Sequence, residues 1–136
     1  MDFLLTMHSH MRHLVLTLGV LAFLFSLITF LRRKHPARWE RVLVKSYVYV
    51  ITLQMILGLI QLIGRWSDYG EMLRLHLEHG FIMLVAVGLG HYGLKFLRAP
   101  APIGARNTMF VIAATLILIV LGILLQPNGR RLLGLE

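Results

Sequence analysis

Histidine is the residue type in this chain best suited to chemistry, and most of its seven copies fall in two short motifs. The first motif, HSHMRH, contains His8, His10 and His13 and leads into an apolar stretch. The second, HLEH, contains His76 and His79 and opens another apolar stretch. Neutral imidazole ligates haem iron and also copper or zinc ions. The motifs therefore predict a haem site or a transition-metal site, unless these histidines merely line a membrane boundary.

The depth of each histidine can be counted from the basic cluster that follows its apolar stretch. His13 and His76 each precede the first basic residue of that cluster by 19 residues, and His79 precedes it by 16. At about 1.5 Å per helical residue, these three should lie at similar depth, with His8 about 7 Å further out than His13. Two facing imidazoles at one depth are what a haem iron with two axial histidines requires.

We therefore predict a haem b site near the outer membrane face, between the first and third apolar stretches. His79 is the expected ligand on the third stretch, with His76 as a further candidate. The ligand on the first stretch is His8 or His13, and depth counting favours His13.

Charged residues beside these histidines are candidates to support the haem. Haem propionates are anionic, and Arg12 and Arg74 are the outer arginines nearest the two motifs. Glu78 could accept a hydrogen bond from a ligating imidazole and so orient it.

His91 stands apart from both motifs, four residues before Lys95 and so about 6 Å from the inner edge of its span. No second histidine matches this depth, but Tyr49 does. An ionisable residue at such depth is a functional candidate. With Tyr49 and Gln54, His91 could bind a quinone or hold a second haem. It could also ligate a chlorophyll magnesium, or simply hydrogen-bond between helices.

Gln54, Gly58 and Gln61 follow one another at spacings of four and three residues and so share one helical face. A stripe of polar and small residues in an apolar helix usually contacts another helix. The alternative is that the stripe lines a cofactor pocket.

The composition shows which elements must carry these residues. Of 136 residues, 57% are hydrophobic and 15% charged, with a mean hydropathy of +0.74. Soluble domains average about 25% charged residues, and disordered chains are far less hydrophobic. Without cysteine, disulfides, thiolate catalysis and iron–sulfur clusters are excluded. A small membrane domain remains.

Four apolar stretches approach the roughly 20 residues that cross a bilayer as a helix. We expect one all-α membrane domain over residues 1–136, an up-down-up-down four-helix bundle. The expected spans are approximately 13–31, 46–64, 76–95 and 107–126. The prolines fall at or beyond the span ends, where they do not break a helix.

Basic residues are unequally distributed between the two sides of this bundle. Nine of the 14 lie on the side of the first and third connections, with a single acid, Glu40. The positive-inside rule makes that side cytoplasmic and puts both termini on the periplasmic side of a bacterial inner membrane. The basic run RRKHPARWER is explained by topology and anionic lipid, so we expect no nucleic-acid partner.

The order of these motifs resembles that of small bacterial four-span proteins labelled "cytochrome b-like". Their motifs are an H-S-x-[LM]-R opening, a Q-x-x-x-G run, a Glu-His pair and a later small-residue motif with histidine. The resemblance implies haem b and electron transfer, and it favours His8 as the ligand on the first span. The matching residues are His8, Ser9, Met11, Arg12, Gln54, Gly58, Glu78, His79, His91 and Gly93.

These observations favour an electron carrier, or a subunit of a membrane redox complex, over a stand-alone enzyme. It would pass electrons between a quinone and an outside partner. The sequence has no Ser-His-Asp order and no phosphate-binding glycine loop. One alternative is a cofactor-free accessory subunit of a respiratory or photosynthetic complex. A third hypothesis is metal-ion binding or transport by the outer histidines.

Overall fold

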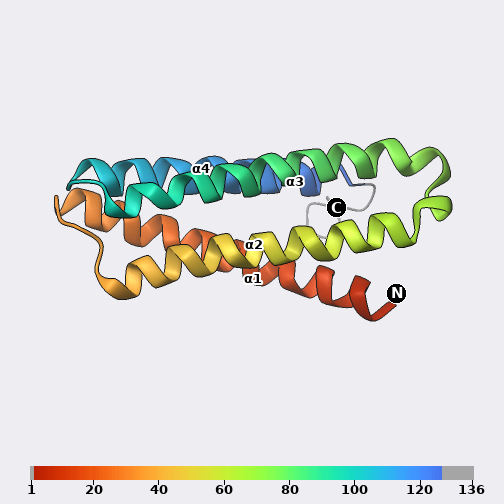
Figure 1. The fold of residues 1–136 in the computed structure, drawn as a ribbon, viewed down its shortest axis with the longest axis horizontal. Coiled ribbons are helices and arrows are strands. Elements are labelled where there is room, and N and C mark those ends of the chain that lie inside the picture. Colours follow the sequence, from red (N-terminus) through yellow and green to blue (C-terminus); the bar gives the residue numbers. More distant parts are fainter. Residues whose placement is uncertain (1, 127–136) are drawn as a thin grey trace.

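The computed structural model describes residues 2–126, and all the regular structure within them is helical. The long helices are α1 (Asp2–Leu31), α2 (Arg38–Gly64), α3 (Leu73–Gly93) and α4 (Ile103–Leu124). Successive helices run in opposite directions along one long axis (Figure 1). The predicted all-α four-helix bundle is therefore confirmed.

The four helices form a ring in which α1 packs against α2 and α4, and α3 packs against the same two neighbours. Consequently α1 and α3 lie diagonally across the bundle, as do α2 and α4. The seam between α2 and α3 is the least extensive of the four. Side chains from diagonal helices can meet only in the interior.

The helices begin before the predicted spans, while their ends coincide with the span ends or fall two residues short of them. α1 begins at Asp2 rather than near residue 13, and α2 begins at Arg38 rather than near residue 46. The length of a stretch without charged residues indicates how much of a helix lies in the hydrocarbon of a bilayer. The helix itself continues until it reaches a residue that cannot be helical. The segment before residue 13 contains no proline or glycine, so nothing interrupts α1 there. The whole HSHMRH motif is thus helical.

The first connection closes α1 with a compact turn. The Lys34 N–H donates to the Thr29 carbonyl at 3.2 Å, and the Arg33 N–H donates to the Phe30 carbonyl at 2.9 Å. Arg33 has φ 57°, the left-handed conformation that this type of helix ending requires. The extended Ala37 then leads into α2.

Each of the four helical stretches is long and apolar enough to cross a membrane. In the most apolar part of each, at most 39% of the residues are buried inside the bundle. Many of the others, largely leucine, isoleucine, valine and phenylalanine, are exposed on the outside of the bundle. The fold is consistent with a multi-pass membrane protein, because this apolar exterior suits lipid rather than water.

The packed core fills the middle of the bundle around Tyr47 and Thr115, whose exposure is 0%. Their hydroxyl oxygens are 2.8 Å apart and join the diagonal helices α2 and α4. Aliphatic side chains surround the pair, among them Val48, Ile51 and Ile112. This tight packing ends toward the end of the bundle where α1 begins.

Candidate cofactor-binding site

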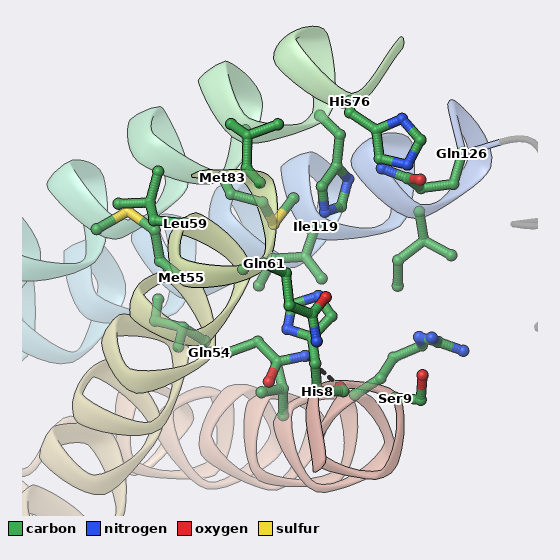
Figure 2. Close-up of a pocket in the computed structure, with 18 of the residues that line it drawn as sticks. His8, Ser9, Gln54, Met55, Leu59, Gln61, His76, Met83, Ile119 and Gln126 are labelled. Carbon is green, nitrogen blue, oxygen red and sulfur yellow. Dashed lines mark hydrogen bonds between the residues drawn. The ribbon is translucent and has the colours of Figure 1, made fainter. Parts of the chain in front are cut away.

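A cavity of about 470 Å³ opens inside the bundle at the end where α1 begins and α4 ends. All four helices contribute to its wall, which is mainly apolar. Figure 2 shows Met55 and Leu59 of α2, Met83 of α3 and Ile119 of α4 around the space. Binding pockets for small molecules and cofactors occupy about 300–1,000 Å³ with mostly apolar linings and a few polar groups. This cavity has both properties.

Two imidazoles reach this cavity from the diagonal helices, His8 from α1 and His79 from α3. His8 shares its helical face with Arg12 and Val15, at spacings of four and three residues, and His79 shares its face with Met83. In Figure 2, His8 rises from α1 toward the other helices, with Gln54 and Gln61 of α2 beside it. The fold thus brings the two histidine motifs together, with His8 lining the cavity from one side of the bundle and His76 and His79 from the other.

The ring of His79 is held by a backbone carbonyl of α4. Its Nδ1 is 2.7 Å from the carbonyl oxygen of Gly122. A carbonyl can only accept, so Nδ1 carries the proton and, in the neutral ring, Nε2 keeps its lone pair. Any Cβ at Gly122 would collide with Met83 and come within 3.2 Å of His79 Nδ1. Metal-ligating histidines commonly donate their second nitrogen to such a carbonyl.

His8 is positioned by α2. The amide nitrogen of Gln54 donates to the His8 carbonyl oxygen at 2.6 Å. The ring edge lies against Gly58, and a Cβ there would be 3.2 Å from His8 Cε1. The ring itself makes no hydrogen bond to any described residue, and its Nδ1 is buried without a partner.

Three buried polar atoms at this cavity have no partner in the described part of the chain: His8 Nδ1, Gln54 Oε1 and Gln61 Nε2. In folded proteins more than about nine in ten buried polar groups are hydrogen-bonded. Three exceptions in the wall of one cavity indicate that it receives a ligand or ordered water with polar groups. The stripe of Gln54, Gly58 and Gln61 therefore lines a pocket, the alternative to a simple helix contact.

The cavity mouth is polar. Arg12 and Arg65 line it from α1 and from the end of α2. His76 also lies there, but its Nδ1 donates to the Met72 carbonyl at 2.9 Å and its ring stacks on Tyr69 with centroids 3.9 Å apart. His76 is therefore part of the rim, while His79 lies deeper.

Two predicted supporting residues lie outside the cavity. Arg74 pairs with Glu78 at 3.0 Å, and the Arg74 side chain is 87% exposed. Neither residue lines the cavity. The orienting acceptor for His79 is the Gly122 carbonyl rather than the Glu78 carboxylate, and Arg12 is the predicted arginine that reaches the cavity.

His13 is exposed, although depth counting favoured it over His8. The two residues are five positions apart, which places them about 140° apart around a helix. With His8 facing the cavity, His13 must face away from it. Counting residues measures height along the helix but not direction around it.

Of the three residues predicted to act together near the inner edge of the bundle, His91, Tyr49 and Gln54, the structure brings together only two. The rings of Tyr49 and His91 are 6.2 Å apart between centroids, so the structure does bring them together. Gln54 is not with them, because its amide lies in the cavity beside His8. The place beside His91 is taken by Thr52, whose hydroxyl is 2.9 Å from His91 Nε2.

Three contributing residues were missed from the sequence: Thr52, Arg65 and Gly122. Arg65 follows Gln61 by four residues and so extends the polar stripe of α2, a signal that was present. Gly122 is the last small residue in a long run of leucine, isoleucine and valine, but nothing in that run shows that it faces His79.

Within residues 2–126, no group of three or more His, Cys, Asp or Glu side chains gathers to hold a metal ion. Three imidazoles line the cavity, those of His8, His76 and His79, and the ring of His76 is already engaged with Met72 and Tyr69. Compared with protein-family models, with curated proteins and with solved structures, the chain gives no significant match. Its function must therefore be argued from the site itself.

Proposed function

We propose that this chain is a membrane-embedded, b-type cytochrome-like protein that binds one haem b between His8 and His79 and transfers electrons. The observation that carries the proposal is the pair of imidazoles meeting in one apolar cavity from diagonal helices. A six-coordinate haem needs two neutral nitrogen donors on opposite sides of a flat apolar slot. The cavity offers that set of groups.

The chemistry of each histidine fits this role. His79 has its Nδ1 proton engaged by Gly122, which leaves Nε2 as the donor atom. His8 has no competing side-chain hydrogen bond in the described chain, and its buried Nδ1 lacks a partner. Both rings are therefore available to a ligand.

The polar mouth fits the propionates of a haem. Arg12 and Arg65 provide two cations where the cavity opens, and the remainder of its wall is largely apolar. Carboxylates favour such cations at the interface, where water still reaches part of the group.

A bound haem would supply a one-electron iron couple. The chain's own part is to present two nitrogen donors, exclude water with apolar side chains and hold the carboxylates at the mouth. With two histidines available to hold the haem iron, electron transfer is the activity that this site supports best.

The setting of the site supports a redox subunit in a bacterial inner membrane. By the positive-inside rule, the basic residues favour a cytoplasmic location for the end of the bundle opposite the cavity, and the cavity would then lie near the periplasmic face. The layout also resembles the small cytochrome b-like proteins. With only short connections between its helices, the membrane domain would exchange electrons through partner subunits.

The test is an absorption spectrum of the protein purified in mild detergent from cells supplied with haem. We expect a sharp α-band on reduction and about one haem per chain. His79→Ala and His8→Ala should lose the haem, whereas the matched control His13→Ala, exposed on the same helix as His8, should keep it. A colourless folded protein would favour the cofactor-free accessory subunit, whereas full haem in His79→Ala would reject His79 as a ligand.

A further inference from the structure

A second polar group lies outside the cavity, on the seam between α2 and α3 toward the inner end of the bundle. It consists of Tyr49 and Thr52 of α2 and His91 of α3. Tyr49 is 58% exposed and His91 is also exposed. In a bilayer these two side chains face lipid, which is an unfavourable place for polar groups without a partner.

The hydrogen bonds of this group fix where its protons are. The Thr52 hydroxyl is 2.8 Å from the Val48 carbonyl, which can only accept, so the single hydroxyl proton is used there. The Thr52 oxygen must then accept from His91, and Nε2 of His91 carries the ring proton at 2.9 Å. In the neutral ring, His91 Nδ1 is left as an acceptor, and it has no hydrogen bond to any described residue.

Two other helical histidines, His10 and His76, differ on this point. Nδ1 of His10 and Nδ1 of His76 each donate to the carbonyl four residues earlier. His91 makes no such bond, because its ring turns across the seam to Thr52. A structural contact between helices needs only Nε2, so the exposed Nδ1 lone pair is unexplained by packing.

There is also room for a ring beside this acceptor. Gly88 precedes His91 by three residues on α3, and a Cβ there would find nothing within 4 Å. The Tyr49 hydroxyl has no hydrogen bond within the described chain and lies in the same neighbourhood, since its ring is 6.2 Å from that of His91. An acceptor, a hydroxyl and an open apolar surface thus lie together.

We propose that Tyr49, Thr52 and His91 bind the headgroup of a lipid-soluble quinol from the bilayer. One ring hydroxyl donates to His91 Nδ1, and the Tyr49 hydroxyl pairs with an oxygen of the same headgroup. Thr52 is a positioning residue that holds the His91 proton on Nε2. The inference deepens the proposed electron-transfer role by naming the class of donor, but binding itself requires no haem.

The position of the proton on the His91 ring determines which oxidation state of the ligand this site prefers. A neutral imidazole with its proton on Nε2 can accept at Nδ1 but not donate there. The quinol has a hydroxyl to give, whereas the oxidised quinone has only carbonyl acceptors. The quinol should therefore bind more tightly than the quinone.

The experiment titrates the purified protein, in phosphatidylcholine nanodiscs under anaerobic conditions, with decylubiquinol and separately with decylubiquinone. Nitrogen-15 labelling of histidine gives a direct readout, because a hydrogen bond to Nδ1 shifts its resonance. The His91 signal is identified by its absence in His91→Phe. We expect a saturable shift with the quinol and a smaller effect with the quinone.

Variants of the three residues distinguish a loss of quinol binding from a general disturbance of the fold. His91→Phe and Tyr49→Phe should weaken quinol binding about five- to tenfold each, the effect of one hydrogen bond. Thr52→Val should weaken binding and also redistribute the His91 proton between its nitrogens. The matched control is Tyr92→Phe, since Tyr92 is 56% exposed at the same end of α3 but contacts Phe96 and Lys95 instead.

Two results would overturn the proposal: no saturable shift in the folded protein, or equal quinol affinity in the wild type, His91→Phe and Tyr49→Phe. The haem question is kept apart by titrating His79→Ala as well. Quinol binding retained there without haem supports this site alone, whereas a haem-containing protein that does not respond to quinol rejects this site and leaves the haem proposal standing.

Discussion

The imidazole of His8 occupies the space that a side chain at Gly58 would need, where α1 packs against α2. A Cβ at residue 58 would stand 3.2 Å from His8 Cε1 and 3.9 Å from each ring nitrogen. The absence of a side chain at Gly58 therefore allows the His8 ring to lie where it does. Glycine here has a steric role, since residue 58 is in the middle of a regular helix.

Gly58→Val should displace His8 from the cavity. Overpacking of this kind costs about 1–3 kcal/mol, which corresponds to a loss of haem affinity of about five- to hundredfold. The measurement is haem retained per chain after purification. The control is Gly88→Val, whose new side chain enters open space. Equal haem content in the two variants would show that His8 is not a ligand.

Arg12 should matter for haem retention, while Arg74 should not. Arg12 lines the cavity mouth, whereas Arg74 is 87% exposed and already paired with Glu78. A hydrogen bond to a charged group is worth about 1.5–3 kcal/mol, so Arg12→Gln should weaken haem binding about ten- to hundredfold. Titration of haem into the haem-free protein measures this. The assignment fails if Arg74→Gln has the larger effect.

Tyr47 and Thr115 give an asymmetric prediction for stability. The Thr115 hydroxyl donates to the Ile112 carbonyl at 2.8 Å, so in the 2.8 Å contact between the two hydroxyls Tyr47 is the donor. Thr115→Val leaves the buried Tyr47 hydroxyl without an acceptor and should cost about 1–3 kcal/mol. Tyr47→Phe leaves Thr115 bonded to Ile112 and should cost only about 0.5–1.5 kcal/mol.

Unfolding of these two variants in mixed detergent micelles measures the difference, with the exposed Tyr92→Phe as a control for loss of a hydroxyl. A greater loss for Tyr47→Phe than for Thr115→Val would contradict this direction of the hydrogen bond.

The fold was predictable from the sequence because the length and hydropathy of an apolar stretch identify a membrane-spanning helix. Helices α1 and α2 begin earlier than the predicted spans, since a helix continues through the polar interface where an apolar run stops. The turn at Arg33 that closes α1 was not predictable, because the hydropathy pattern does not indicate that this arginine adopts a left-handed backbone conformation.

The candidate site was only half predictable, for a geometric reason. Residue type and approximate depth identified His8 and His79 as candidates. They could not show whether His8 or His13 faces the interior of the bundle. In an apolar chain the outward and inward faces are both hydrophobic, so the sequence gives little information on direction around a helix. The backbone carbonyl of Gly122 could not be predicted at all, because every residue has one.

The orientation of the bundle can be tested with single cysteines, because the chain contains none. Glu71 lies between α2 and α3 at the cavity end, and His35 lies between α1 and α2 at the basic end; both are exposed. In intact spheroplasts, a membrane-impermeant maleimide should label Glu71→Cys at once and His35→Cys only after the membrane is opened. The reverse pattern would put the cavity between His8 and His79 on the cytoplasmic side, so that any electron partner would have to be sought there.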